Sequence, residues 1–209
     1  MRRHYNKFII LGLGILVFVL SISFKTNSDQ KIKLLEIAKE YKTYAVYTSS
    51  PWKWTIALCS SAHLGDIDSV HFISSADAAT SPHGNKMYKF FVKDMFSYND
   101  TAIKKQPFGQ VLVKETWNVK EVSQESVLKN NLVAKRSEND GKWYMPTTIS
   151  ELFIMYKEKE NNDNDKGWVY GIVSLEDNSV KILTNGKISS CISCHKGTKY
   201  DRVFGMEEK

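Results

Sequence analysis

The stretch QVLVKETW, from Gln110 to Trp117, sets the pattern from which the fold can be inferred. Successive side chains of a β-strand point to opposite faces of its sheet, so Val111, Val113, Glu115 and Trp117 would share one face. The other face is more polar and consists of Leu112, Lys114, Thr116 and Asn118. The alternation therefore predicts a β-strand with one apolar face.

Four further stretches are rich in aromatic and β-branched residues and are also predicted to be strands. They are Lys86–Lys93, Leu152–Lys157, Trp168–Leu175 and Val180–Leu183. The turn-forming cluster 161–167 joins two of them and predicts a hairpin, and a short helix is expected over 95–105. Apolar residues at three-residue spacing predict a helix over 32–44. Together these elements predict an α+β fold, mainly an antiparallel β-sheet with an N-terminal helix.

Composition and charge exclude several classes of protein. The chain has 209 residues, of which 42% are hydrophobic and 25% charged, as in ordinary globular proteins, so a disordered or fibrous chain is excluded. The net charge is +6, but Arg2, Arg3 and Lys7 supply three of these charges at the N-terminus. The weak remaining positive charge argues against nucleic acid as a partner.

The N-terminus has the pattern of an export signal. Arg2, Arg3 and Lys7 precede an apolar run, Phe8–Leu20, and small residues around Ser23 suit cleavage. Because the run is near the minimum length of a membrane span, an uncleaved anchor stays open. Residues 1–23 are thus predicted to be a signal peptide or anchor, and 24–58 a linker with an amphipathic helix. We expect the rest to be periplasmic or exported, soluble or anchored to the outer face of the cytoplasmic membrane.

The motif that carries chemistry is Cys191-Ile192-Ser193-Cys194-His195, the attachment sequence of haem c. Two thiols at this spacing bond to the two vinyl groups of the haem, and the adjacent His195 presents its imidazole to the iron as axial ligand. The sequence therefore predicts one covalently attached haem c, held in a C-terminal attachment segment by Cys191, Cys194 and His195.

Two other interpretations of the cysteines stay open. A thioredoxin-like redox pair would lie at the start of a helix near a βαβ pattern, whereas this motif follows strands. A zinc site could be completed by Cys59 and His63 together with Cys191 and Cys194. The export signal favours haem, because cytochromes c mature outside the cytoplasmic membrane.

Around this motif the chain resembles the cytochrome P-460 family, which includes the cytochromes c′-beta. The resemblance covers roughly residues 60–206, and the matching pieces occur in the same order along the chain. They are Ser81–Asn85, Met87–Val92, Pro107–Glu115, Met155–Lys157, Gly167–Gly171, Cys191–Lys196 and Asp201–Phe204. On this basis residues 59–209 are predicted to form a cytochrome P-460-like haem domain.

The resemblance implies a mostly antiparallel β fold, one five-coordinate haem c and often a homodimer. Enzymes of the P-460 type oxidise hydroxylamine and handle nitric oxide, with a lysine linked covalently to the haem edge and a carboxylate near the open iron face. The cytochromes c′-beta instead cap that face with phenylalanine and bind nitric oxide or carbon monoxide without turnover. The expected partners are thus a small nitrogen compound or diatomic gas and an exported redox protein.

Glu115 and Lys89 are the candidate catalytic residues. A carboxylate on an apolar face is costly unless it is paired or used, so Glu115 is the candidate carboxylate; alternatively, it pairs with a lysine at a strand edge. Lys89, between Met87 and Phe91 on one strand face, is the candidate for the cross-link. The alternatives are Lys86, Lys93, Lys104 and Lys105 for the link, and Phe90 or Phe91 as a cap on the iron.

A six-coordinate electron carrier is the third function that stays open. Its sixth iron ligand would come from His63, His71, His83, Met145, Met155 or Met206. Arg202, close after the motif, is a candidate to bond a haem propionate or to act on the proximal side of the haem; alternatively, it is a surface charge. The sequence thus favours a P-460-like oxidoreductase, with a gas-binding protein and an electron carrier as alternatives.

Overall fold

A computed structural model describes residues 27–47, 73–74, 86–100, 102–130, 134–136, 141–175 and 179–204. The predicted signal or anchor lies outside these residues, as do Cys59, His63, His71, His83 and Met206. Within the described ranges, no helix combines the length and apolar composition that a membrane span requires.

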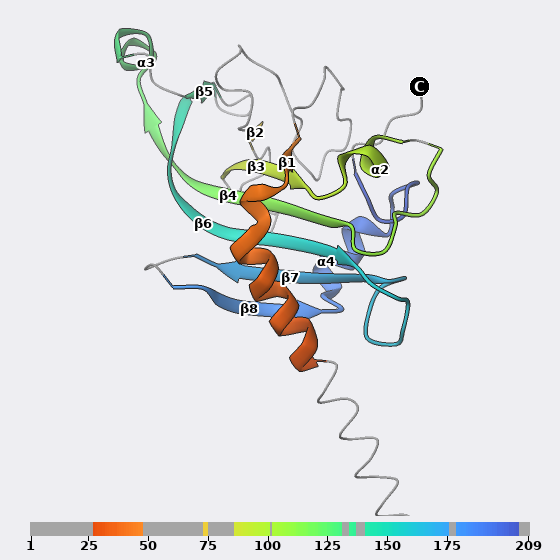
Figure 1. The fold of residues 1–209 in the computed structure, drawn as a ribbon. Helices are drawn as coiled ribbons and strands as arrows, with labels where there is room; N and C mark the ends of the chain where they lie inside the picture. Colours follow the sequence, from red (N-terminus) through yellow and green to blue (C-terminus); the bar gives the residue numbers. More distant parts are fainter. Residues whose placement is uncertain are drawn as a thin grey trace, which may run out of the picture.

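The described residues form one eight-stranded sheet in which all neighbouring strands are antiparallel (Figure 1). The strands are β1 Ala45–Val46, β2 Ile73–Ser74, β3 Met87–Val92, β4 Val111–Val122, β5 Lys135–Arg136, β6 Trp143–Lys157, β7 Trp168–Ser174 and β8 Lys181–Gly186. Their order is β1-β3-β4-β6-β7-β8, with β2 also paired to β3 and β5 to β6. The predicted α+β fold with a mainly antiparallel sheet is confirmed.

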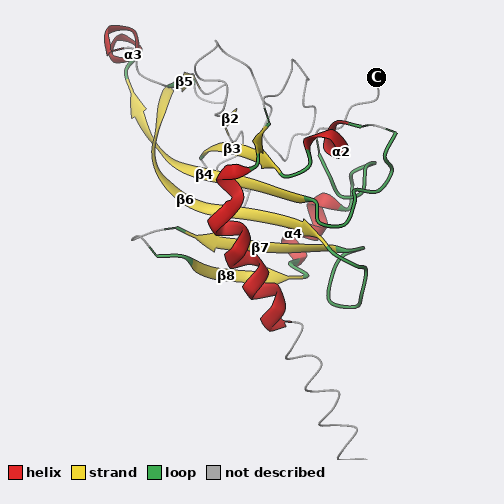
Figure 2. Cartoon of the chain, in the orientation of Figure 1, coloured by secondary structure: helices red, strands yellow, loops and turns green. Residues whose placement is uncertain are grey.

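Helices cover both faces of this sheet. The N-terminal helix, described over residues 27–40 and continued by η1 (Tyr41–Thr43), crosses one face, while α4 (Ser189–His195) lies on the other (Figure 2). The remaining helices are α2 (Met95–Asn99) and α3 (Gln124–Asn130). We call the two sides of the sheet the helix-side face and the α4-side face.

The hairpin of β4 and β6 is longer than the sequence predicts. β4 continues past Trp117, and β6 begins at Trp143 rather than at Leu152. The register shifts on both sides of Trp117, and these irregularities break the alternation that marks a strand in the sequence. The helix predicted over 95–105 ends at Asn99.

The helix-side face is a closed apolar core. Leu34, Ile37 and Tyr41 of the N-terminal segment pack against Val113, Ile154 and their neighbours on the sheet. The helix approaches closely because β7 carries glycine beneath it: a Cβ at Gly171 would lie 2.4 Å from Leu34 Cδ2. Burial of this apolar stripe is what holds the helix on the sheet.

The α4-side face carries a second core. Val92, Leu112, Met155 and Tyr170 lie in register across β3, β4, β6 and β7, and all four are buried. Ile188, Cys191 and Ile192, at the start of α4 and within it, pack against this row. The motif therefore lies on the side of the sheet opposite the N-terminal helix.

Candidate haem site

The two motif cysteines lie on one short helix. Residues three apart on a helix are neighbours on its surface, so Cys191 and Cys194 of α4 present their thiols on the same side. Both are half-buried and no disulfide joins them. Burial raises the pKa of the Cys191 thiol. Two neighbouring thiols at the edge of an apolar core suit attachment to an apolar macrocycle.

The imidazole of His195 is held in one orientation. Its Nδ1 lies 2.6 Å from the backbone carbonyl oxygen of Arg202. Because a carbonyl oxygen can only accept, Nδ1 carries the hydrogen and Nε2 is left to bind a metal. Burial lowers the pKa of His195, which favours the neutral, ligating form. The rings of Tyr170 and Phe204 lie 5.6 and 4.8 Å from the imidazole, centroid to centroid.

The carbonyl that accepts from His195 belongs to a strained turn. Val203 N donates to Tyr200 O at 2.8 Å, which closes a turn with Asp201 and Arg202 in the middle. Their φ angles are 44° and 71°, the positive signs of a type I′ turn, although neither residue is glycine. Such a conformation persists only where the surroundings hold it.

Arg202 is tied to the β6–β7 hairpin. Its guanidinium donates to both carboxylate oxygens of Asp165, at 2.7 and 3.0 Å, and also to the carbonyl oxygen of Lys196. The Tyr170 hydroxyl donates to Asp165 as well. Burial alone would raise the pKa of Asp165, but the hydrogen bond and positive charge of Arg202 outweigh it and lower that pKa.

Asp201 is held equally firmly. Its carboxylate accepts from Lys157 Nζ at 2.8 and 3.0 Å, and both side chains are only 5% exposed. The backbone N–H of Gln106 donates to the same carboxylate, and Trp168 Nε1 donates to the Asp201 carbonyl at 2.7 Å. The turn behind His195 is therefore fixed from two sides.

These residues fit a haem c. The group needs two adjacent thiols, an imidazole with Nε2 available and an apolar surface beside them, and the α4-side face provides all three. The next row of that face, in register on β3, β4 and β6, consists of Phe90, Lys114 and Phe153. Within the described part of the chain, no group of three or more His, Cys, Asp or Glu side chains gathers as a site for a bare metal ion would require.

The two candidate catalytic residues lie together, but on the other face. Lys89 of β3 is paired with Glu115 of β4, and Lys89 Nζ lies 5.3 Å from the ring centroid of Trp117. Glu115 is 1% exposed and accepts from the Tyr41 hydroxyl and, at 2.7 Å, from Trp117 Nε1. The sheet thus lies between these residues and Cys191, and neither is brought to the haem side. Their catalytic roles stay predictions that this placement does not favour.

The other sequence candidates are divided between the faces. Phe90 packs on the α4-side core, whereas Phe91 belongs to the helix-side core. Lys86 pairs with Glu151 at 2.5 Å, and Lys93 lies 4.0 Å from Glu40. Lys104 and Lys105 are exposed, Met155 is buried on the α4-side face, and Met145 lies opposite Lys120 in the far half of the hairpin.

Sequence reasoning missed Lys114 as a site candidate. Its Nζ lies 3.7 Å from the ring centroid of Tyr88, and its charge acts on His195, so it belongs to the α4-side face. The alternation in β4 already separates Lys114 from Glu115. The sequence does not predict on which face of the sheet α4 packs.

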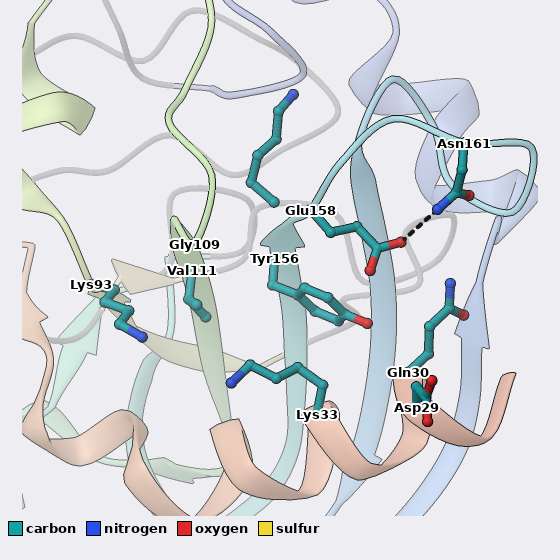
Figure 3. A pocket seen from close by; sticks show the side chains of 10 residues that line it. Asp29, Gln30, Lys33, Lys93, Gly109, Val111, Tyr156, Glu158 and Asn161 are labelled. Atoms are coloured by element: carbon teal, nitrogen blue, oxygen red, sulfur yellow. Dashed lines mark hydrogen bonds between the residues drawn. The ribbon is translucent and has the colours of Figure 1, made fainter. Parts of the chain in front are cut away.

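A cavity of about 440 Å³ lies elsewhere, between the N-terminal helix and the ends of β4 and β6 (Figure 3). Its lining mixes charges of both signs, including Asp29, Lys33, Lys93 and Glu158, and Glu158 accepts a hydrogen bond from Asn161. It is on the helix side of the sheet, and Cys191, Cys194 and His195 do not line it. The cavity is thus separate from the haem site.

Comparison with protein families agrees with this site. A family model described as Cytochrome P460 matches residues 69–205, which include β2 to β8, α4 and the turn behind His195. A comparison with curated proteins finds no match. Members of this family carry covalently attached haem c, as the motif predicts. From fold, site and family model together, the chain belongs to the Cytochrome P460 family and is a c-type haem protein.

Proposed function

We propose that the protein is an exported oxidoreductase that oxidises hydroxylamine, nitric oxide or both and passes the electrons to an exported redox protein. The observation that carries this proposal is a lysine on the haem side: Lys114 lies between Phe90 and Phe153 on the α4-side face. Export is supported by the N-terminal pattern and by a family that is typically exported. A haem held by Cys191, Cys194 and His195 supplies the redox-active iron.

Lys114 is the residue that this proposal assigns to the haem edge. The P-460 enzymes that the chain resembles use a lysine there, and Lys114 of β4 lies on the α4-side face, paired with Phe153. It lies one register row from Leu112, which packs in the core that receives Cys191. The amine stacks against Tyr88, so it is held near the sheet surface rather than extended into solvent.

Glu151 is the carboxylate that the proposal uses as proton acceptor. It shares the parity of Phe153 and Met155 on β6, which places it on the α4-side face, one row beyond Phe153. Its carboxylate pairs with Lys86, and the side chain keeps 24% of its surface exposed. A partly exposed carboxylate can take a proton from a bound substrate and release it to water.

The test compares two alanine variants of the haem protein. Lys114→Ala is expected to change the haem absorption spectrum and abolish hydroxylamine oxidation, whereas Lys89→Ala, its matched control on the opposite face, leaves both unchanged. Peptide mapping of the unsubstituted protein should recover the haem on the peptide with Cys191 and also on the peptide with Lys114. Unchanged turnover in Lys114→Ala would contradict the proposal.

The alternative is a nitric oxide or carbon monoxide binding protein without turnover. The observation that favours it is the pair of phenylalanines, Phe90 and Phe153, in register on either side of Lys114. For that function we expect an ordinary high-spin haem c spectrum, haem recovered only on the peptide with Cys191, and faster gas binding when Phe90 or Phe153 is changed to alanine.

A further inference from the structure

Arg202 connects three segments of the haem site. Its side chain reaches Asp165 in the β6–β7 hairpin and the Lys196 carbonyl just after α4, and its own carbonyl accepts from His195. The same hairpin supplies Lys157, which binds Asp201 in the same turn. Both ion pairs thus bring the β6–β7 hairpin against the turn behind the axial histidine.

We propose that Asp165 and Arg202 are positioning residues for His195: their ion pair fixes the direction of the Arg202 carbonyl and thereby sets the reduction potential of the haem. Both residues act through His195 rather than on a substrate. The inference uses only the haem attachment that the family carries, so it holds whether the protein oxidises a nitrogen compound, binds a gas or transfers electrons.

The turn behind His195 is strained. Positive φ is costly for each of these two consecutive non-glycine residues, so the turn would relax without side chains that hold it. Asp165 receives two parallel hydrogen bonds from the guanidinium, a geometry that fixes direction as well as distance. The pair is also shielded from water, with 15% and 11% of the side chains exposed.

The position of the carbonyl then acts on the iron through the imidazole. An axial histidine whose Nδ1–H is hydrogen-bonded is a stronger electron donor, and such outer contacts tune the potential of the metal. The bond from His195 to Arg202 O is short, at 2.6 Å. A turn that drifts lengthens this bond, weakens the donor and makes the ferric state less stable.

The experiment uses the haem protein with Asp165→Asn, which keeps the size of the side chain and removes its charge. We expect a more positive reduction potential in a potentiometric titration. Resonance Raman spectra of the reduced protein should show the iron–histidine stretch at lower frequency. Glu121→Gln is the matched control. It breaks an exposed ion pair with Lys142 that lies away from α4 and has a similar length, 2.8 Å.

Two further variants test the same role of the ion pair if Asp165→Asn folds poorly. Tyr170→Phe removes only the hydroxyl that donates to Asp165, and it should shift both readouts in the same direction by a smaller amount. Arg202→Gln combined with Asp165→Asn should shift the potential no further than either change alone. A potential and stretching frequency equal to those of the unsubstituted protein in these variants would overturn the proposal and leave the pair a structural role only.

Discussion

The two faces of the sheet use the same strand for different purposes. On the helix-side face, β4 contributes Val111, Val113 and Glu115 to a core that the N-terminal helix closes. On the α4-side face, it contributes Leu112 to the core under α4 and Lys114 to the next row. Lys114 and Glu115 are adjacent in the sequence but lie on opposite faces of the sheet.

The surroundings of the two charges differ in kind. Glu115 is almost fully buried and accepts from two donors, Tyr41 and Trp117, as a buried carboxylate must if it is not to destabilise the fold. Lys114 lies on a face that α4 covers only in part, between two half-buried phenylalanines. The burial and full pairing of Glu115 indicate a structural role. The partly exposed row of Phe90, Lys114 and Phe153 is instead typical of a binding surface.

The largest effect should come from the thiols of the α4-side face. Changing Cys191 and Cys194 together to alanine is expected to abolish covalent haem attachment, because no thiol remains in α4. The measurement is the mass of the denatured protein after expression with the cytochrome c maturation machinery. Cys59→Ala is the control and should retain the haem; loss of haem in that variant would contradict the assignment.

On the helix-side face, Glu115→Ala should reduce stability strongly. The change leaves a buried donor, Tyr41 Oη, and a partly buried one, Trp117 Nε1, without their acceptor, and we expect a loss of about 3 kcal/mol in the free energy of unfolding. Chemical denaturation gives this value. The haem absorption spectrum of the folded variant should not change, and a large spectral shift would instead bring Glu115 to the haem.

Gly171→Ala tests how closely the N-terminal helix packs. The added Cβ would lie 2.4 and 2.6 Å from the two methyl carbons of Leu34, so the helix must shift or Leu34 must change rotamer. We expect a loss of about 2 kcal/mol in the free energy of unfolding. The double variant with Leu34→Ala should lose less stability than the sum of the two single changes, because the methyl carbons that clash are gone. A loss equal to that sum would mean that the clash with Leu34 is not the cause.

The smallest effect concerns acid stability on the α4 side. Because the pKa of Asp165 is lowered in the folded protein, its contribution is present above the unfolded value of about 3.9 and is lost as pH falls through the lower folded value. Unfolding midpoints measured from pH 6 to pH 2 should show a shallower acid dependence in Asp165→Asn. Asp163→Asn, at an exposed position on the same hairpin, should match the unsubstituted protein.

Much of this architecture follows from the sequence. Alternation predicts the central strand around Val113, and the polar cluster 161–167 predicts the β6–β7 hairpin. The cysteine spacing marks the residues of the motif, but not that they form a helix, α4. The family resemblance suggested from those pieces is confirmed by the family model. Such features are local, so a single stretch of sequence contains them.

The placement of the site could not be predicted in the same way. An acid on an apolar face, such as Glu115, must be paired or used, but its partner Tyr41 is 74 residues away and only the fold brings it close. The roles of Asp165 and Arg202 depend likewise on a contact across 37 residues. Which face α4 covers is a tertiary fact, and it puts Lys114 rather than Lys89 on the same side of the sheet as the motif.

The most direct test of the difference between the faces is methyl relaxation in the oxidised haem protein, where the ferric iron broadens nearby resonances. With a haem held by α4, the methyl groups of Val92 and Leu112 should relax much faster than those of Val113 and Ile154, which belong to the helix-side core. Faster relaxation of Val113 and Ile154 would place the iron on the other face and contradict the account.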